Sequence, residues 1–93
     1  MADITYIISK IREAQQERGI PIAELARRAG MAPNALGESL RGNRMLTAEE
    51  LVRLSAILGI ELWSYIEPEF RQEVAERRKR FIEEFGPNSG GLA

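Results

Sequence analysis

Residues 31–44, MAPNALGESLRGNR, decide how the rest of this sequence is interpreted. Pro33 suits the first turn of a helix, where a backbone N–H is not needed. Leu36 and Leu40 are four residues apart, so their side chains lie on one face of that helix. Gly42 breaks the pattern two residues later. The stretch therefore predicts a short helix over residues 32–41, with both leucines in the core.

The segments before this stretch predict two more helices. Apolar residues recur at three- and four-residue spacing from Ile4 to Ala14, and Gly19 follows them, which predicts an amphipathic helix over residues 3–18. Pro21 suits the first turn of the next helix, which ends at Gly30. The apolar face of this second helix is rich in alanine, so another helix can approach it closely.

The segment TAEELVRLSAILG predicts the clearest helix in the chain. Thr47 and Glu50 form a capping box at its start, and Gly59 closes its end. ELWSYIEP follows as a short turn or helix, which we expect to end at Pro68. The residues expected in the core are Ile7, Ile11, Leu25, Leu36, Leu40, Leu51 and Leu54.

A charged helix is predicted from Glu69 to Phe85. Four of its apolar side chains lie along one line, which we call the phenylalanine stripe: Phe70, Val74, Phe81 and Phe85. The stripe either folds back on its own domain or pairs with the same stripe of a second chain, as a symmetric dimer requires. Trp63 and Tyr65 precede this helix and are expected either to support it or simply to close the core beneath it. Of the two arrangements, we expect the homodimer.

Length and composition limit what the protein can do. With 93 residues, 44% of them hydrophobic, the chain can build one small core. It contains no cysteine and no histidine, which removes the thiolate and imidazole metal ligands and the usual general base. We therefore expect no metal site, no cofactor and no enzymatic activity.

Two further features bear on location and partners. No apolar run approaches the roughly 20 residues of a membrane-spanning helix, and the start MADITY has an acid where a secretory signal has basic residues. A soluble cytoplasmic protein is expected. The net charge is -1, but residues 20–44 hold four arginines against two glutamates, so the middle of the chain is mildly basic. The RRKR run at residues 77–80 is flanked by glutamates and is expected to be a solvated helix face.

Two short helices joined at AGMA are typical of the helix-turn-helix, whose second helix enters the major groove of DNA. Together with IREAQQERGI, ELARRAGMAPNAL, LRGNR and TAEELVRLSAILGIEL, they give a chain that resembles the DNA-binding domain of the Cro and phage-repressor (Xre-like) family from Ile8 to Ile66. The resemblance implies an all-α fold with a five-helix DNA-binding domain at residues 1–66. A C-terminal helix at residues 67–86 and a flexible tail at residues 87–93 are expected to follow.

The resemblance also implies which residues face the DNA. Those expected at base edges are Pro33, Asn34, Gly37 and Glu38, and those expected at phosphates are Arg41, Asn43 and Arg44. An asparagine can bond adenine through N6 and N7, and a glutamate can accept from the N4 amino group of cytosine. The simpler interpretations are an ordinary first-turn polar residue for Asn34, an intramolecular arginine partner for Glu38, and a solvated loop for the arginines.

The sequence departs from the family pattern at two places. The family often carries Ser and Gln, the latter on a phosphate, where this chain has Pro21 and Ile22, so that contact is expected to be lost. The family also often pairs an arginine in the first helix with a glutamate near the end of the third. Gln15 and Leu40 stand there instead, and because both charges are missing together, no lone charge is left buried.

Two functions follow from these patterns. The first is a sequence-specific transcriptional regulator that binds operator DNA as a dimer, a repressor of prophage or bacterial type. The second is a helix-turn-helix module that has lost DNA binding and engages a protein partner, such as a toxin or a sensor. The even charge balance and the acid at Glu38 favour the second function, and the arginines around the predicted helix favour the first.

Overall fold

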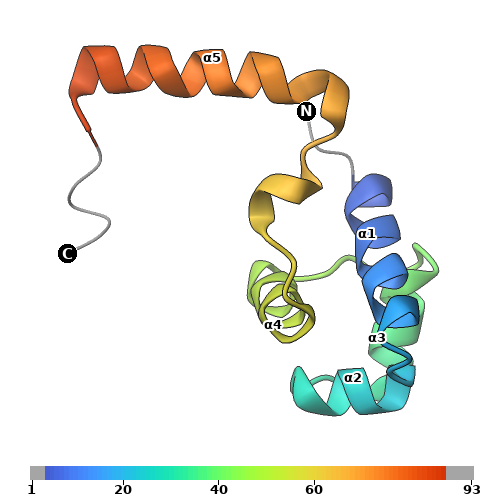
Figure 1. The fold of residues 1–93 in the computed structure, drawn as a ribbon. Coiled ribbons are helices and arrows are strands. Elements are labelled where there is room, and N and C mark those ends of the chain that lie inside the picture. Colours follow the sequence, from blue (N-terminus) through green and yellow to red (C-terminus); the bar gives the residue numbers. More distant parts are fainter. Residues whose placement is uncertain (1–3, 88–93) are drawn as a thin grey trace.

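The computed structural model describes residues 4–87, and within them the chain forms helices joined by short loops (Figure 1). The elements are α1 (Ile4–Glu17), α2 (Ile22–Arg28), α3 (Pro33–Leu40), α4 (Ala48–Leu58), the 3-10 helix η1 (Leu62–Tyr65) and α5 (Pro68–Phe85). The predicted all-α class is confirmed. Of the predicted tail, residues 88–93 lie outside the described residues.

The helix ends follow from residues close by in the sequence. The Thr47 hydroxyl accepts from the Glu50 N–H at 3.1 Å, and the Glu50 carboxylate accepts from the Thr47 N–H at 2.9 Å, which confirms the capping box. Gly59 ends α4 with φ +69°, in the left-handed region that glycine adopts without strain. The expectation that Pro68 ends a helix is wrong, because Pro68 occupies the first turn of α5.

The core lies between α1, α2, α3 and α4. Of the predicted core residues, Ile7 and Leu51 are only partly buried at its edge. Ile8 is buried in α1 beside Ile11, and Met31 and Tyr65 also belong to the core. The largest fully buried side chains are Ile11, Leu25, Leu36, Leu54, Leu58 and Ser39.

Helix packing fixes α3 between two neighbours. α2 packs on α3, and α1 packs on α3, α4 and η1. Leu36 and Leu40 anchor α3 in the core, and at the other end of the domain the Tyr65 hydroxyl lies 2.7 Å from that of Ser55. The position of α3 is therefore set by packing on one side, which leaves its other side open.

α5 extends away from this domain as an arm (Figure 1). None of its residues is buried, and the radius of gyration is 15.5 Å, against about 12 Å for a compact chain of this length. No helix between residues 4 and 87 combines the length and the apolar composition needed to cross a membrane.

Candidate nucleic-acid interface

The turn between α2 and α3 sets how the open side of α3 is presented. Gly30 adopts φ +71°, and the Met31 N–H donates to the Ala26 carbonyl at 2.8 Å. Met31 is buried, so the chain is anchored immediately before α3 begins. Ala32 and Pro33 then start the helix at the surface. α3 is in this way held rigidly at its start while its first turn stays exposed.

The exposed first turn carries two of the predicted site residues. Pro33 and Asn34 are both exposed, and the Asn34 side chain makes no hydrogen bond within the part of the chain that the structure describes. An amide free at both its donor and its acceptor can bond a partner without breaking an internal contact. Asn34 is therefore the predicted site residue most available to a ligand.

Glu38 has intramolecular partners. Its carboxylate accepts from the Asn43 side-chain amide at 3.0 Å and lies 3.4 Å from the Arg41 guanidinium. These contacts, the Asn43 hydrogen bond first, lower the pKa of Glu38 below its ordinary value. Glu38, which was predicted to contact a base, is thus joined to Asn43 and Arg41, which were predicted to contact phosphates.

Gly37 is buried, although the sequence placed it on the open side of α3. The Arg41 guanidinium lies across it: a Cβ built at position 37 would be 3.6 and 3.7 Å from the two terminal nitrogens of Arg41. The absence of a side chain at position 37 leaves room that the arginine occupies. Any approach of a ligand to the Gly37 backbone therefore requires Arg41 to move aside.

Arg44 is tied to the domain more firmly than a solvated loop would allow. It donates to both carboxylate oxygens of Glu50, at 3.0 and 2.9 Å, and to the Ser39 hydroxyl at 3.0 Å. The Arg44 hydrogen bond is the first cause that lowers the pKa of Glu50 to about 2. This contact links the loop after α3 to the capping box of α4, and the sequence analysis did not predict it.

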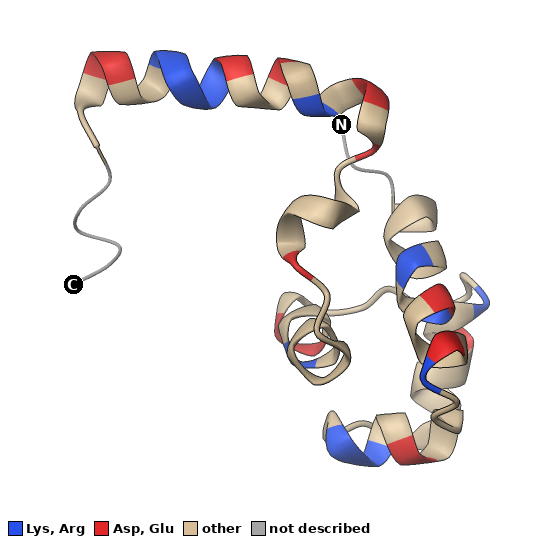
Figure 2. Cartoon of the chain, viewed as in Figure 1, with Lys and Arg blue, Asp and Glu red and all other residues tan. Residues whose placement is uncertain are grey.

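The arginines of α2 are also paired. Glu24 in its first turn accepts from both Arg27 and Arg28. Figure 2 shows that acidic and basic residues both occur along α2 and along α5. No three acidic side chains in residues 4–87 are arranged to hold a metal ion. The mildly basic middle of the sequence is therefore largely neutralised from within.

Comparison with known proteins assigns the sequence of these helices to a family. The sequence matches the helix-turn-helix family HTH_3 over residues 8–62, which spans α1 to the start of η1. The chain belongs to this helix-turn-helix family. The match confirms the family that the residues of α2 and α3 indicated.

Two curated relatives of this helix-turn-helix chain are the HTH-type transcriptional regulator RamB from two strains of Mycobacterium tuberculosis, CDC 1551 / Oshkosh and ATCC 25618 / H37Rv. Each is 29% identical over 75 residues, which cover 81% of this chain. The matched region spans only 16% of the length of these relatives. No solved structure matches the chain significantly.

Within the helix-turn-helix fold, the departures noted in the sequence have structural counterparts. The Gln15 side-chain amide donates to the Ile20 carbonyl and so holds the loop between α1 and α2. Leu40 is 5% exposed and packs in the core. Ile22, at the start of α2, is 39% exposed and has no polar group to offer a phosphate.

The phenylalanine stripe lies outside the matched residues, on the arm. Phe81 and Phe85 are 58% and 67% exposed, and their ring centroids are 4.7 Å apart. Phe70 and Val74 are partly buried. Trp63 lines a groove with Ala75 and Ile82 of α5, so it meets the arm on a face other than the stripe, whereas Tyr65 packs in the core.

Proposed function

We propose that this chain binds duplex DNA in a sequence-specific manner, with α3 as the recognition helix in the major groove. The observation that carries the proposal is the arrangement of α3, which is anchored in the core through Leu36 and Leu40 and keeps its first turn exposed beside α2. Membership of a helix-turn-helix family and likeness to proteins named as transcriptional regulators support it. The chain would then act as the DNA-binding part of a transcription regulator.

The base-reading residues in this proposal are Pro33, Asn34, Gly37 and Glu38. Asn34 supplies a free amide for an adenine, a bidentate contact worth about 1 to 3 kcal/mol of discrimination. Glu38 can accept from a cytosine amino group through Oε1, but Asn43 and Arg41 both contact its Oε2 and so restrict how the carboxylate can be oriented. Discrimination at the base that Asn34 meets should therefore be stronger than at the base that Glu38 meets.

The phosphate contacts in this proposal are Arg41, Asn43 and Arg44. Arg41 and Asn43 are exposed, and their partner is a surface carboxylate that a phosphate can replace. Arg44 is held by Glu50 and Ser39, but its guanidinium has five N–H donors and uses three bonds inside the domain. Arg44 thus offers its remaining donors from a fixed position.

We further propose that the protein binds its operator as a homodimer and represses transcription by occupying that DNA. A dimer presents two copies of α3 to half-sites about one helical turn apart. The exposed phenylalanine stripe provides an apolar surface for the second chain. The homodimer and the repression concern the assembled protein, and both go beyond what the single domain supports.

Selection of bound sequences from a random pool of duplex DNA tests this function. A short, repeated preference should emerge from the pool. Asn34→Ala should then relax the preference at one base pair per half-site, whereas Arg41→Ala should weaken binding to all sequences by a similar factor. Absence of binding to any duplex at low salt would contradict the proposal.

The second candidate function is a protein-binding module, favoured by the pairing of Arg27, Arg28, Arg41 and Arg44 with carboxylates of the same chain. Salt dependence separates the two functions. DNA binding should weaken by about 0.9 log units per phosphate contact for each tenfold rise in salt. An apolar protein contact on the stripe should change little, because salt does not screen burial of apolar surface.

A further inference from the structure

The face of α1 opposite Arg41 carries a cation that the sequence analysis missed. Arg12 is exposed, and its side chain makes no hydrogen bond or ion pair within residues 4–87. The other arginines of the helix-turn-helix domain all have internal partners: Arg18 bonds the Ala14 carbonyl, Arg27 and Arg28 bond Glu24, Arg41 bonds Glu38, Arg44 bonds Glu50, and Arg53 bonds Glu49. Arg12 therefore differs from every other arginine of the domain.

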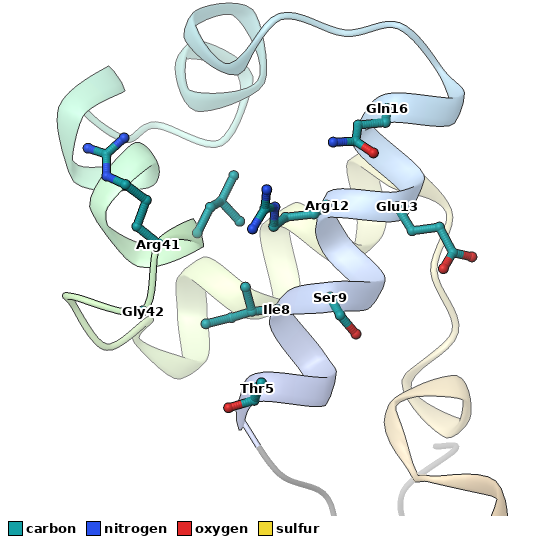
Figure 3. Close-up of a pocket in the computed structure, with 9 residues that line it drawn as sticks. Thr5, Ile8, Ser9, Arg12, Glu13, Gln16, Arg41 and Gly42 are labelled. Atoms are coloured by element: carbon teal, nitrogen blue, oxygen red, sulfur yellow. The ribbon is translucent and has the colours of Figure 1, made fainter.

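Arg12 lines an open groove of about 540 Å³ between α1 and the end of α3. Figure 3 shows its guanidinium extending toward α3, where Arg41 and Gly42 line the other wall and the Arg41 guanidinium turns away from Arg12. Glu13 also lines the groove, and its carboxylate extends to the side of α1 away from Arg41. Leu40 lies at the base of the groove. Arg12 is thus the unpaired cation of the groove, and Arg41 lines the other wall with its guanidinium held over Gly37 and beside Glu38.

We propose that this groove is a binding site for a phosphate of the DNA backbone, which Arg12 contacts directly and Arg41 reaches by swinging from Glu38 into the groove. The proposal rests on the proposed function, because the groove adjoins the recognition helix through Arg41 and Gly42. A phosphate that meets Arg12 replaces only water, since no carboxylate has to be released. At Arg41 the same phosphate takes the place of Glu38, a contact of 3.4 Å between exposed side chains.

This site adds a contact from α1, outside the two helices of the motif. It extends the phosphate-binding surface from the loop after α3 onto the first helix of the domain. Because phosphate contacts set register and affinity and not sequence, Arg12 is a positioning residue for α3 on the duplex.

The test uses the full chain and a duplex that the wild-type protein binds, with affinity measured over a range of salt concentrations. Arg12→Ala should weaken binding about three- to tenfold for every sequence and lower the salt slope by about 0.9. Arg12→Lys should retain most of the affinity, because it keeps the charge. Circular dichroism and thermal unfolding of each variant show whether the fold is kept.

Lys10→Ala is the matched control, since it removes the same charge from the same helix. Lys10 lies over the Tyr6 ring at 5.4 Å and lines a different groove, beside Gly59. It should change the affinity less than about twofold, because a charge away from the interface is screened.

The outcomes separate this inference from the proposed function. If the wild-type chain binds no duplex, the proposed function fails and the groove has no ligand. If Arg41→Ala weakens binding and Arg12→Ala leaves affinity and salt slope unchanged, the proposed phosphate site in the groove is wrong, but the proposed DNA binding stands. The groove is also overturned if Lys10→Ala weakens binding as much as Arg12→Ala, or if Arg12→Ala changes the preferred sequence.

Discussion

Gly37 combines a cost in helix stability with a position on α3, the proposed recognition helix. Glycine inside a helix is less favourable than alanine by about 1 kcal/mol, and Gly37 lies in the middle of α3 with no backbone angle that demands glycine. A Cβ at this position would meet only Arg41, at ordinary contact distance. The fold therefore does not require a glycine here, and the proposed close approach of α3 to bases would supply a reason for one.

Gly37→Ala is expected to stabilise the protein by up to about 1 kcal/mol and to weaken DNA binding, because the methyl group keeps α3 farther from the bases. Urea unfolding and a DNA titration measure the two effects separately. Gly42→Ala is the control: Gly42 has φ +83°, which alanine adopts only with strain, so that change should destabilise the domain. A gain in stability without any loss of binding would remove the proposed role of Gly37.

Glu50 makes the stability of the domain depend on acid pH. Its pKa in the folded protein is about 2, chiefly because of the Arg44 hydrogen bond, and it is about 4.3 in an unfolded chain. A pKa lowered by folding means that the ionised carboxylate stabilises the fold above about pH 4.5, and that this stabilisation is lost as the pH falls toward 2.

Glu50→Gln should therefore reduce the free energy of unfolding at pH 7 by about 1 kcal/mol or more, since the amide can still accept from Thr47 but cannot pair with the Arg44 charge. The difference from wild type should shrink between pH 4.5 and 2. Glu49→Gln is the control, because the Glu49 side chain is 69% exposed and its pair with Arg53 lies at the surface. Equal effects of Glu50→Gln at pH 7 and at pH 2.5, measured by urea unfolding, would contradict this account.

At the scale of the helix, the sequence predicted the helix starts and ends that depend on residues close by in the chain. The capping box of Thr47 and Glu50, the first-turn Pro33 and the terminal Gly59 act over a few residues, and the structure confirms all three. The long α5 also appears within one residue of its predicted start. Local capping and periodicity were sufficient for these elements.

The contacts of α3 with the rest of the molecule could not be predicted in this way. Arg44 reaches Glu50 of the next helix, and Arg41 lies over Gly37 in a conformation that only the folded domain selects. Arg12 carries no motif, and its relation to Arg41 appears only when α1 is packed beside α3. Residue types were therefore predictable at this site, but the partners of its charged side chains were not.

At the scale of the whole molecule, the arm is the feature without a partner. Most helices in proteins gain their stability by packing an apolar face against other elements and not from propensity alone. None of the 18 residues of α5 is buried. The exposed end of the phenylalanine stripe does not fold back on the domain within residues 4–87, and the homodimer expected from the sequence stays a proposal for this surface.

The double variant Phe81→Ala with Phe85→Ala tests the dimer. Both side chains are more than half exposed, so the thermal stability of the domain itself should change little, whereas a dimer should dissociate because it loses the apolar surface of both rings. Sedimentation measures the mass, and DNA titration should show weaker binding once the two copies of α3 are no longer joined. Met45→Ala with Val52→Ala is the matched control, since these residues are 69% and 56% exposed and lie on the domain. A wild-type chain that sediments as a monomer at high concentration would contradict the dimer, and a double variant with a much less stable domain would show that the stripe packs on its own domain.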